Sequence, residues 1–261
     1  MIIDAHTHIH NEQILKDYST KGGRRISRSV VMAWYKDSLE ELLKFVDKHK
    51  NLVVVGTIDV FGDLGGQLKN IEELFKRKRA VGLKLYPGYQ HFYPSDKEIW
   101  PIAELCQEYE RPLIFHSGDV YDPEGSALLK YTEPIYIDEL AVKFPQCKII
   151  VSHFGFPYFL ETAMIMSRNA NVYTELSGVI DSSETLREKK RKLIEYVQDL
   201  ERVFAYYPNL KSKVMFGTDY GGEDTPLNLV QPYIDLVQRV FIGKERKNVF
   251  YRLAEKLFFE K

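Results

Sequence analysis

Two apolar runs, AVGLKLYPG (residues 80–88) and PLIFHSG (residues 112–118), flank an amphipathic segment, DKEIWPIAELCQEYE (residues 96–110). Each run has the length of a strand and is almost continuously apolar, which is typical of parallel strands covered on both faces. The segment between them has the apolar spacing of a helix, and Ser95 and Glu98 near its start have the spacing of a capping box. We therefore predict a strand, a helix and a second, parallel strand.

The same alternation continues along the chain of 261 residues. The other strand-like runs lie at residues 1–10, 28–33, 52–60, 148–155, 171–178 and 213–222. Eight units at this length are typical of a closed barrel. We predict an α/β fold in which residues 1–261 form a single (β/α)8 TIM barrel domain, with a polar insertion at residues 11–27 as its least regular part.

The composition limits the partners of the protein. The formal net charge is only −1, so the sequence lacks the concentrated basic face that nucleic-acid binding normally requires. The opening stretch is acidic and rich in histidine, so we expect it not to be a targeting segment. No window approaches eighteen apolar residues, and Cys106 and Cys147 do not have metal-binding spacing. We predict a cytoplasmic enzyme acting on a small molecule, bound to neither nucleic acid nor membrane, and leave open whether it forms a homo-oligomer.

Histidines alternate in the opening stretch, MIIDAHTHIH. Because a strand points alternate side chains to opposite faces, His6 and His8 face the same way and form a two-pronged ligand. The residues around them are too apolar for a surface strand. We therefore expect this strand to be buried and to open onto a site.

Three more ionisable residues end predicted strands: His116, His153 and Asp219. In a barrel the carboxyl ends of the strands meet at one mouth, so these side chains are expected to converge with His6 and His8. Burying so many polar groups without a cation would cost several kcal/mol. We predict a divalent metal, with zinc expected first and manganese, iron or cobalt as alternatives.

The combined pattern resembles the amidohydrolase superfamily. The phrases IDAHTHI, SHFG, NVYTELSG and FGTDY are similar especially to its amidohydrolase-related branch of metal-dependent hydrolases and nonoxidative decarboxylases. The resemblance runs from Met1 to the last helix and departs at Leu253, where related helices commonly carry asparagine. It implies that one metal is bound by four residues: His6, His8, His116 and Asp219.

The resemblance also implies the chemistry. Asp219 would accept the proton of a metal-activated water and return it to the leaving group, and His153 would act as a second catalytic residue. Asp4 is a candidate for orienting a ligand, and a buried structural carboxylate is the alternative. Glu175 is a further candidate buried acid to which the sequence assigns no role.

Lys84 leaves the number of metals open. The phrase KLYP resembles the strand-four lysine of dihydroorotase, which is carboxylated and bridges two metals. In that case Lys84 and His153 would be additional ligands. We favour one metal, because the other phrases point to a branch in which single-metal sites are common.

Residues near the predicted mouth are candidates for substrate binding. Tyr86 and Tyr89, in the aromatic stretch YPGYQHFY, would form a wall for a ring, and packing over the rim is the alternative. Lys84 and Arg28 would contact an acidic group. We predict hydrolysis of an amide, ester or lactone-like bond, with nonoxidative decarboxylation of an aromatic or unsaturated acid as the alternative.

Overall fold

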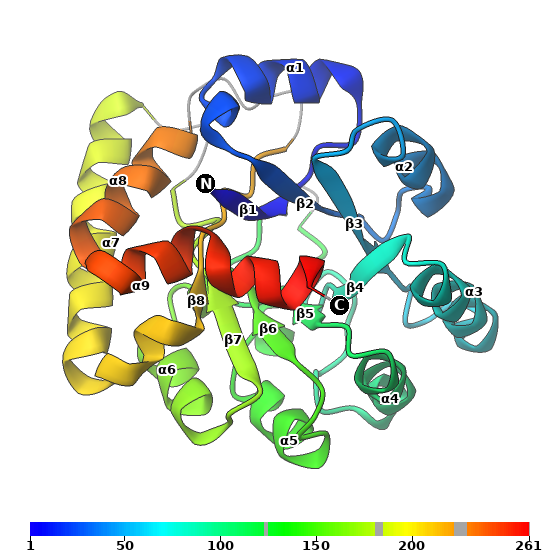
Figure 1. Ribbon diagram of the computed structural model, residues 1–261. Coiled ribbons are helices and arrows are strands. Elements are labelled where there is room, and N and C mark those ends of the chain that lie inside the picture. The colour runs from blue at the N-terminus through cyan, green and yellow to red at the C-terminus, as the bar shows by residue number, and fades with distance from the viewer. Residues whose placement is uncertain (123–124, 181–184, 222–228, 261) are drawn as a thin grey trace.

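The computed structural model describes residues 1–122, 125–180, 185–221 and 229–260. All eight predicted runs form strands, and each is parallel to the next in one eight-stranded sheet (Figure 1). The strands are β1 (Ile3–Thr7), β2 (Arg28–Met32), β3 (Leu52–Thr57), β4 (Ala80–Leu85), β5 (Leu113–Phe115), β6 (Ile149–Val151), β7 (Val172–Glu175) and β8 (Val214–Met215).

Backbone hydrogen bonds between the first and last strands close the sheet into a barrel. The amide of Ala5 donates to the carbonyl of Phe216 at 2.9 Å, and the amide of His8 donates to Tyr220 at 2.7 Å. The amide of Asp219 donates to the carbonyl of His6 at 2.9 Å. The predicted (β/α)8 barrel is confirmed, and its closure brings Asp219 next to the histidines of β1.

Helices surround the barrel (Figure 1). They are α1 (Glu12–Thr20), α2 (Leu39–Val46), α3 (Leu64–Lys76), α4 (Trp100–Glu108), α5 (Tyr136–Lys143), α6 (Phe159–Arg168), α7 (Leu186–Tyr206), α8 (Val230–Val240) and α9 (Gly243–Lys247).

One of these helices differs from the sequence expectation. Much of the expected polar insertion is α1, whose N-cap Asn11 accepts a hydrogen bond from the amide of Ile14 at 2.9 Å.

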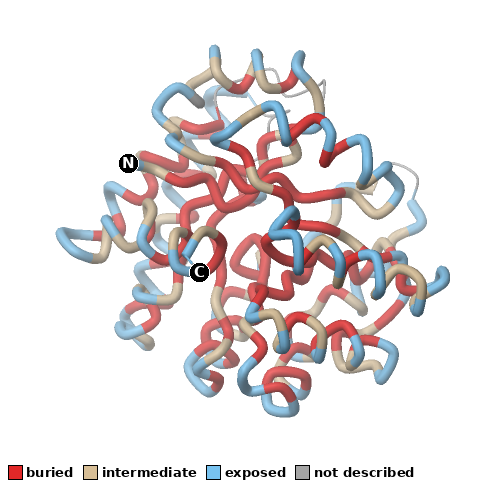
Figure 2. Tube along the Cα trace, turned by 45° about the vertical axis from the view of Figure 1, so that its right-hand side comes forward, coloured by how far each residue is buried: buried red, intermediate tan, exposed pale blue. Residues whose placement is uncertain are grey.

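The core has two parts, one between barrel and helices and one inside the barrel. The inner part contains strand residues such as Val30, Ile114 and Met215. Two short helical segments, η6 (Asn248–Arg252) and η7 (Glu255–Phe259), cross the N-terminal end of the barrel, and Leu253 and Phe258 pack against the inner core. Leu253 therefore contributes an apolar side chain to the layer that covers the N-terminal end of the barrel. Buried residues line the centre and exposed residues the outer helices in Figure 2.

Within the described part of the chain, every helix is too short or too polar to cross a lipid bilayer. With the N-terminal end of the barrel covered, the functional site is expected at the opposite end, where the strands finish.

Candidate metal centre and active site

Three predicted ligands converge at the carboxyl ends of β1 and β8. The Nε2 atoms of His6 and His8 lie 3.4 Å apart. Oδ1 of Asp219 lies 3.2 Å from Nε2 of His6 and 3.3 Å from Nε2 of His8. We call these side chains the His6–His8–Asp219 group.

The spacing of this group fits a divalent cation. Bonds of about 2.0–2.1 Å at a tetrahedral angle place ligand atoms about 3.3–3.5 Å apart, which is close to the spacing seen here. In addition, the buried Oδ1 of Asp219 accepts no hydrogen bond within the described residues. Burial alone would raise the pKa of Asp219, but the neighbouring imidazoles, His6 above all, hold it well below its ordinary value. Two imidazoles and an ionised carboxylate are a normal donor set for such an ion.

Glu175, at the end of β7, orients His6. Its Oε1 lies 2.9 Å from Nδ1 of His6 and accepts the backbone amide of His153 at 2.8 Å, while Oε2 accepts the amide of Ser177 at 2.6 Å. Burial opposes ionisation of Glu175, but His6 and these hydrogen bonds lower its pKa below the ordinary range. The carboxylate therefore holds the Nδ1 proton of His6, which leaves the lone pair on Nε2 for a metal.

The protonation state of His6 suits a ligand. Burial, followed by the nearby charge of Lys84, lowers the pKa of His6 to about 4. The ring is therefore neutral at neutral pH, as metal binding requires.

His153 lies beside His6, as predicted. The two rings stack with their centroids 5.0 Å apart, and Nδ1 of His153 is 3.0 Å from Oγ of Ser177. Burial also lowers the pKa of His153, so this imidazole is neutral. His153 forms a second candidate metal-binding group with His6 and Glu175. The binding groups found among the described residues thus share His6.

His116 is at the mouth but outside both groups. Its ring is centred 5.1 Å from that of His153, and its Nε2–H donates to the carbonyl of Asp119 at 3.1 Å. This tautomer leaves Nδ1 as the nitrogen that can bind a metal. The assignment of His116 as a fourth ligand stays a prediction.

Lys84 is completely buried at the end of β4. Its ammonium group donates to Oγ of Ser152 at 2.6 Å. Burial lowers its pKa to about 8, although Glu175 and Asp219 act in the opposite direction. Its roles as ligand of a second metal and as substrate contact remain predictions.

Asp4 accepts hydrogen bonds from backbone and hydroxyl groups of the β1–β8 seam. Within the described residues, the predicted hydrogen bond to a ligand side chain is not among them. Asp4 accepts the backbone amide of His6 at 3.3 Å, the hydroxyl of Tyr18 at 2.9 Å, and the amide and hydroxyl of Thr218 at 3.0 and 2.7 Å. Burial raises its pKa to about 7. Asp4 therefore holds together the two backbone segments that carry His6 and Asp219.

Two hollows open beside the His6–His8–Asp219 group. The first, of about 560 Å³, is the Trp34 pocket, and its lining includes His8, Trp34, Tyr89, Tyr121 and Asp219. The second, of about 170 Å³, is the His116 pocket, and its lining includes Tyr89, His116, His153, Lys192 and Asp219. Asp219, Tyr89 and Tyr121 line both hollows.

The predicted substrate-binding tyrosines occupy different positions. Tyr89 lines both pockets. Tyr86 is buried, donates its hydroxyl to the carbonyl of Ala33 at 2.6 Å and contacts Trp34 edge-on at 4.5 Å. Tyr86 thus supports the pocket wall from behind.

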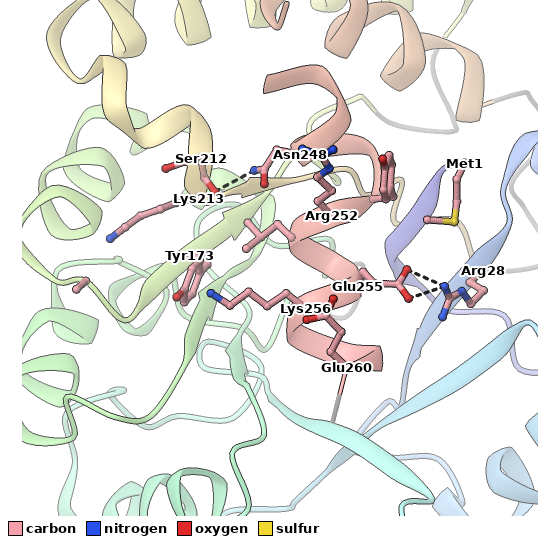
Figure 3. A pocket seen from close by; sticks show the side chains of 13 residues that line it. Met1, Arg28, Tyr173, Ser212, Lys213, Asn248, Arg252, Glu255, Lys256 and Glu260 are labelled. Carbon is pink, nitrogen blue, oxygen red and sulfur yellow. Dashed lines mark hydrogen bonds and ion pairs between the residues drawn. The ribbon is translucent and has the colours of Figure 1, made fainter. Parts of the chain in front are cut away.

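The position expected for Arg28 is wrong. Arg28 begins β2, at the barrel end away from the mouth, and its guanidinium contacts both carboxylate oxygens of Glu255 at 2.7 Å (Figure 3). It lines a different hollow, of about 680 Å³, next to the C-terminal segment. The predicted mouth lies at the carboxyl ends of the strands. A residue that begins a parallel strand, as Arg28 does, therefore lies at the opposite end of the barrel.

Sequence reasoning missed Ser177, Trp34 and Tyr121. Ser177 follows the last residue of β7 by two positions, so the strand-end rule could have found it. Trp34 and Tyr121 lie in loops after β2 and β5. Nothing in the local sequence of either loop reveals that they meet.

Comparisons with known proteins agree with this geometry. The model of the Amidohydrolase family matches residues 27–258. A dihydroorotase from Buchnera aphidicola subsp. Schizaphis graminum is 22% identical over 214 residues, which cover 75% of this chain and 58% of that protein. The chain therefore spans less than two thirds of the length of this relative.

Three solved structures share the fold at low sequence identity. An uncharacterized TIM-barrel protein from Bordetella bronchiseptica has a TM-score of 0.75 at 15% identity, covering 98% of this chain and 97% of its own. A probable 2-pyrone-4,6-dicarboxylic acid hydrolase from Acinetobacter baumannii has a TM-score of 0.68 at 12% identity, with 98% of both chains covered.

The third is a 5-carboxyvanillate decarboxylase from Novosphingobium aromaticivorans, complexed with manganese. It has a TM-score of 0.64 at 16% identity, covering 95% of this chain and 80% of its own. These likenesses confirm the barrel, and the family match covers all strands but β1. The chain, with its strand-end histidines and aspartate, belongs to the amidohydrolase family.

Proposed function

We propose that the chain is a metal-dependent hydrolase that cleaves an amide, ester or lactone-like bond in a small molecule. The observation that carries this proposal is the spacing of the His6–His8–Asp219 group, which matches the ligand spacing of a tetrahedral ion. Zinc is the metal we propose first, with manganese, iron or cobalt as alternatives. His116 is proposed as the fourth ligand through Nδ1.

The chemistry of such an ion is Lewis acidity, which lowers the pKa of water in the site. Asp219 is ionised and reaches both hollows, so it accepts the proton of the attacking water and passes it to the leaving group. His153 lines the His116 pocket, where it holds the carbonyl oxygen of the substrate. Glu175 and Ser177 fix the orientations of His6 and His153.

We propose one ion per chain. Lys84 is a ligand only after modification of its amine, and that amine donates to Ser152 at 2.6 Å. In addition, Glu175 is fully engaged in orienting His6 and the backbone of residues 153 and 177. These contacts favour a single centre on His6, His8 and Asp219.

Nonoxidative decarboxylation is a second candidate, favoured by one observation. Lys192 lines the His116 pocket together with His153 and Asp219. A cationic side chain at this place would attract a substrate carboxylate towards the reacting end of the site.

One experiment separates the two candidates. The metal-loaded protein is incubated with a panel of cyclic esters, lactones, amides and aromatic carboxylates, and acid release and carbon dioxide release are measured in parallel. Acid release that is lost in Asp219→Asn supports hydrolysis. Turnover that yields only carbon dioxide overturns the hydrolase assignment in favour of decarboxylation.

A further inference from the structure

The Trp34 pocket has aromatic walls. The rings of Trp34 and Tyr89 meet edge-on with centroids 5.1 Å apart, and Tyr121 and Leu39 are further residues of the lining. Behind Trp34 lies the buried ring of Tyr86, and Tyr89 in turn contacts the ring of His116 at 5.0 Å. Such a hollow of about 560 Å³ is large enough for a substituted ring.

The walls are held in place by hydrogen bonds. The hydroxyl of Tyr89 donates to the carbonyl of Tyr121 at 3.1 Å and accepts the backbone amide of Tyr121 at 3.0 Å. Burial raises the pKa of Tyr89 to about 12, so this hydroxyl stays neutral. The loops after β4 and β5 are thereby joined, and a ring that enters the pocket meets a preorganised surface.

The charged groups of the pocket are acidic. Asp37 and Glu41 are exposed at the rim, and the half-buried Asp219 is a third acidic residue of the lining. Among the described lining residues the basic side chains are His8 and His10, with no lysine or arginine. The nearby Lys36 extends towards the ring of Tyr35, with Nζ 5.8 Å from the centroid.

The N-terminus of α2 also borders the pocket, and its dipole favours anions. Here that effect is offset within the helix. Ser38 accepts the amide of Glu41 at 3.3 Å, and Glu40 and Glu41 place two carboxylates in the first turn. The net charge at the rim of the pocket is therefore negative.

We propose that the Trp34 pocket binds the non-reacting part of the substrate, and that this part is an uncharged or cationic ring without a carboxylate. The proposal rests on the proposed function, because the pocket reaches the metal-binding group through His8 and Asp219. Such a preference would distinguish this chain from the solved structures named for a dicarboxylic acid or for carboxyvanillate. A second carboxylate on the ring would face Asp37 and Glu41 and be repelled by them.

Binding of hydroxamates to the zinc-loaded protein tests the proposal. Hydroxamates chelate divalent metals, so acetohydroxamate reports the centre alone and benzohydroxamate adds a ring. Para-aminomethyl and para-carboxy derivatives of benzohydroxamate then add opposite charges. We expect benzohydroxamate to bind more tightly than acetohydroxamate, the aminomethyl probe at least as tightly, and the carboxy probe most weakly of the three ring probes.

Variants assign the preference to named residues. Asp37→Asn with Glu41→Gln is expected to reduce the preference for the aminomethyl over the carboxy probe by roughly twofold to fivefold for each acid removed. Glu40→Gln is the matched control, because Glu40 is on the same helix, pairs with Lys44 and does not line the pocket. Trp34→Ala is expected to reduce the advantage of benzohydroxamate over acetohydroxamate by roughly threefold to tenfold.

The outcomes distinguish the specificity of the Trp34 pocket from the presence of the metal centre. Equal affinity for all three ring probes, or tightest binding of the carboxy probe, overturns the inference while leaving the metal centre intact. Failure of every hydroxamate, acetohydroxamate included, to bind the zinc-loaded protein overturns the proposed function and this inference with it.

Discussion

Nδ1 of His6 lies 2.9 Å from Oε1 of Glu175, and both side chains are 1% exposed. A residue at the end of β7 thus determines which nitrogen of a β1 histidine can bind a metal. The contact makes Glu175 a positioning residue for the centre, because a carboxylate at this place keeps the Nε2 lone pair directed at His8 and Asp219.

Glu175→Gln is expected to weaken metal binding by about tenfold to a hundredfold, the usual effect of losing an outer partner of a histidine ligand. The amide also presents a donor where His6, His153 and Ser177 all require an acceptor. Competition with a chromogenic chelator measures the affinity. Glu201→Gln, an exposed position on α7, is the control, and equal affinities in the two variants would contradict the role of Glu175.

His8→Gln is expected to lose more metal affinity than Glu175→Gln, because it removes one of the three converging atoms. His10→Gln is the matched control. His10 is two residues away, exposed, and bonded through Nδ1 to the carbonyl of His8 at 3.0 Å.

Thermal unfolding with and without metal gives the readout. A free ion at a hundred times its Kd stabilises the native state by about 2.7 kcal/mol, so the melting temperature of the wild type and of His10→Gln should rise on loading. A similar rise in His8→Gln would show that the ion binds elsewhere.

The sequence was sufficient for the barrel and for the residues at the ends of its strands. In a parallel barrel the order of strands follows the order of the chain, and closure places the last strand beside the first. His6 and Asp219 therefore meet, although they are far apart in the sequence. A strand-end residue is therefore assigned to the mouth by its place in its own strand. The same rule applied to Arg28 would have placed it at the other end.

The loops could not be assigned in this way. Trp34 and Tyr121 belong to different units, and their meeting in one pocket depends on how two loops fold over the rim. The hydrogen bonds between Tyr89 and Tyr121 are likewise long-range contacts that no local pattern reveals. The tautomer of His116 depends on the carbonyl of Asp119, which is a matter of loop conformation.

The buried amine of Lys84 predicts a pH dependence of stability in the metal-free protein. Its pKa falls from 10.5 to about 8 on folding, so between these values the unfolded chain binds more protons than the native one. The contribution of Lys84 to the free energy of unfolding therefore rises with pH across that window, by about 3 kcal/mol in total. At pH values below the window, burial of the charged amine destabilises the native state.

Lys84→Met should remove this slope. The lost hydrogen bond to Ser152 adds an offset that does not depend on pH, so the difference between wild type and variant isolates the titration. The measurement is urea unfolding of the two metal-free proteins at pH values from about 7.5 to 10.5. This range spans the shifted and the ordinary pKa of Lys84. Parallel curves for the two proteins would show that the amine is not desolvated in the native state.

The position of His153 depends on a glycine. Gly178 has a φ of +75°, and a Cβ built on it would lie 2.3 Å from Nδ1 of His153. Alanine at this position must adopt a left-handed backbone and must also displace the ring from Ser177. Gly125 has a similar φ of +70°, and no heavy atom of the described residues lies within 4 Å of such a Cβ, so Gly125→Ala serves as the control for the backbone cost.

We expect Gly125→Ala to destabilise the protein by about 1 kcal/mol and Gly178→Ala to add roughly 1–3 kcal/mol to that figure, as overpacking of a buried contact does. Nδ1 of His153 contacts Ser177, which also contacts His6. Displacement of the His153 ring should therefore lower kcat as well as stability. Urea unfolding gives the stability, and kcat of the metal-loaded protein gives the activity. If both variants lose the same stability and retain the same kcat, the ring of His153 yields to a methyl group without consequence, and its proposed role at the carbonyl oxygen of the substrate must be abandoned.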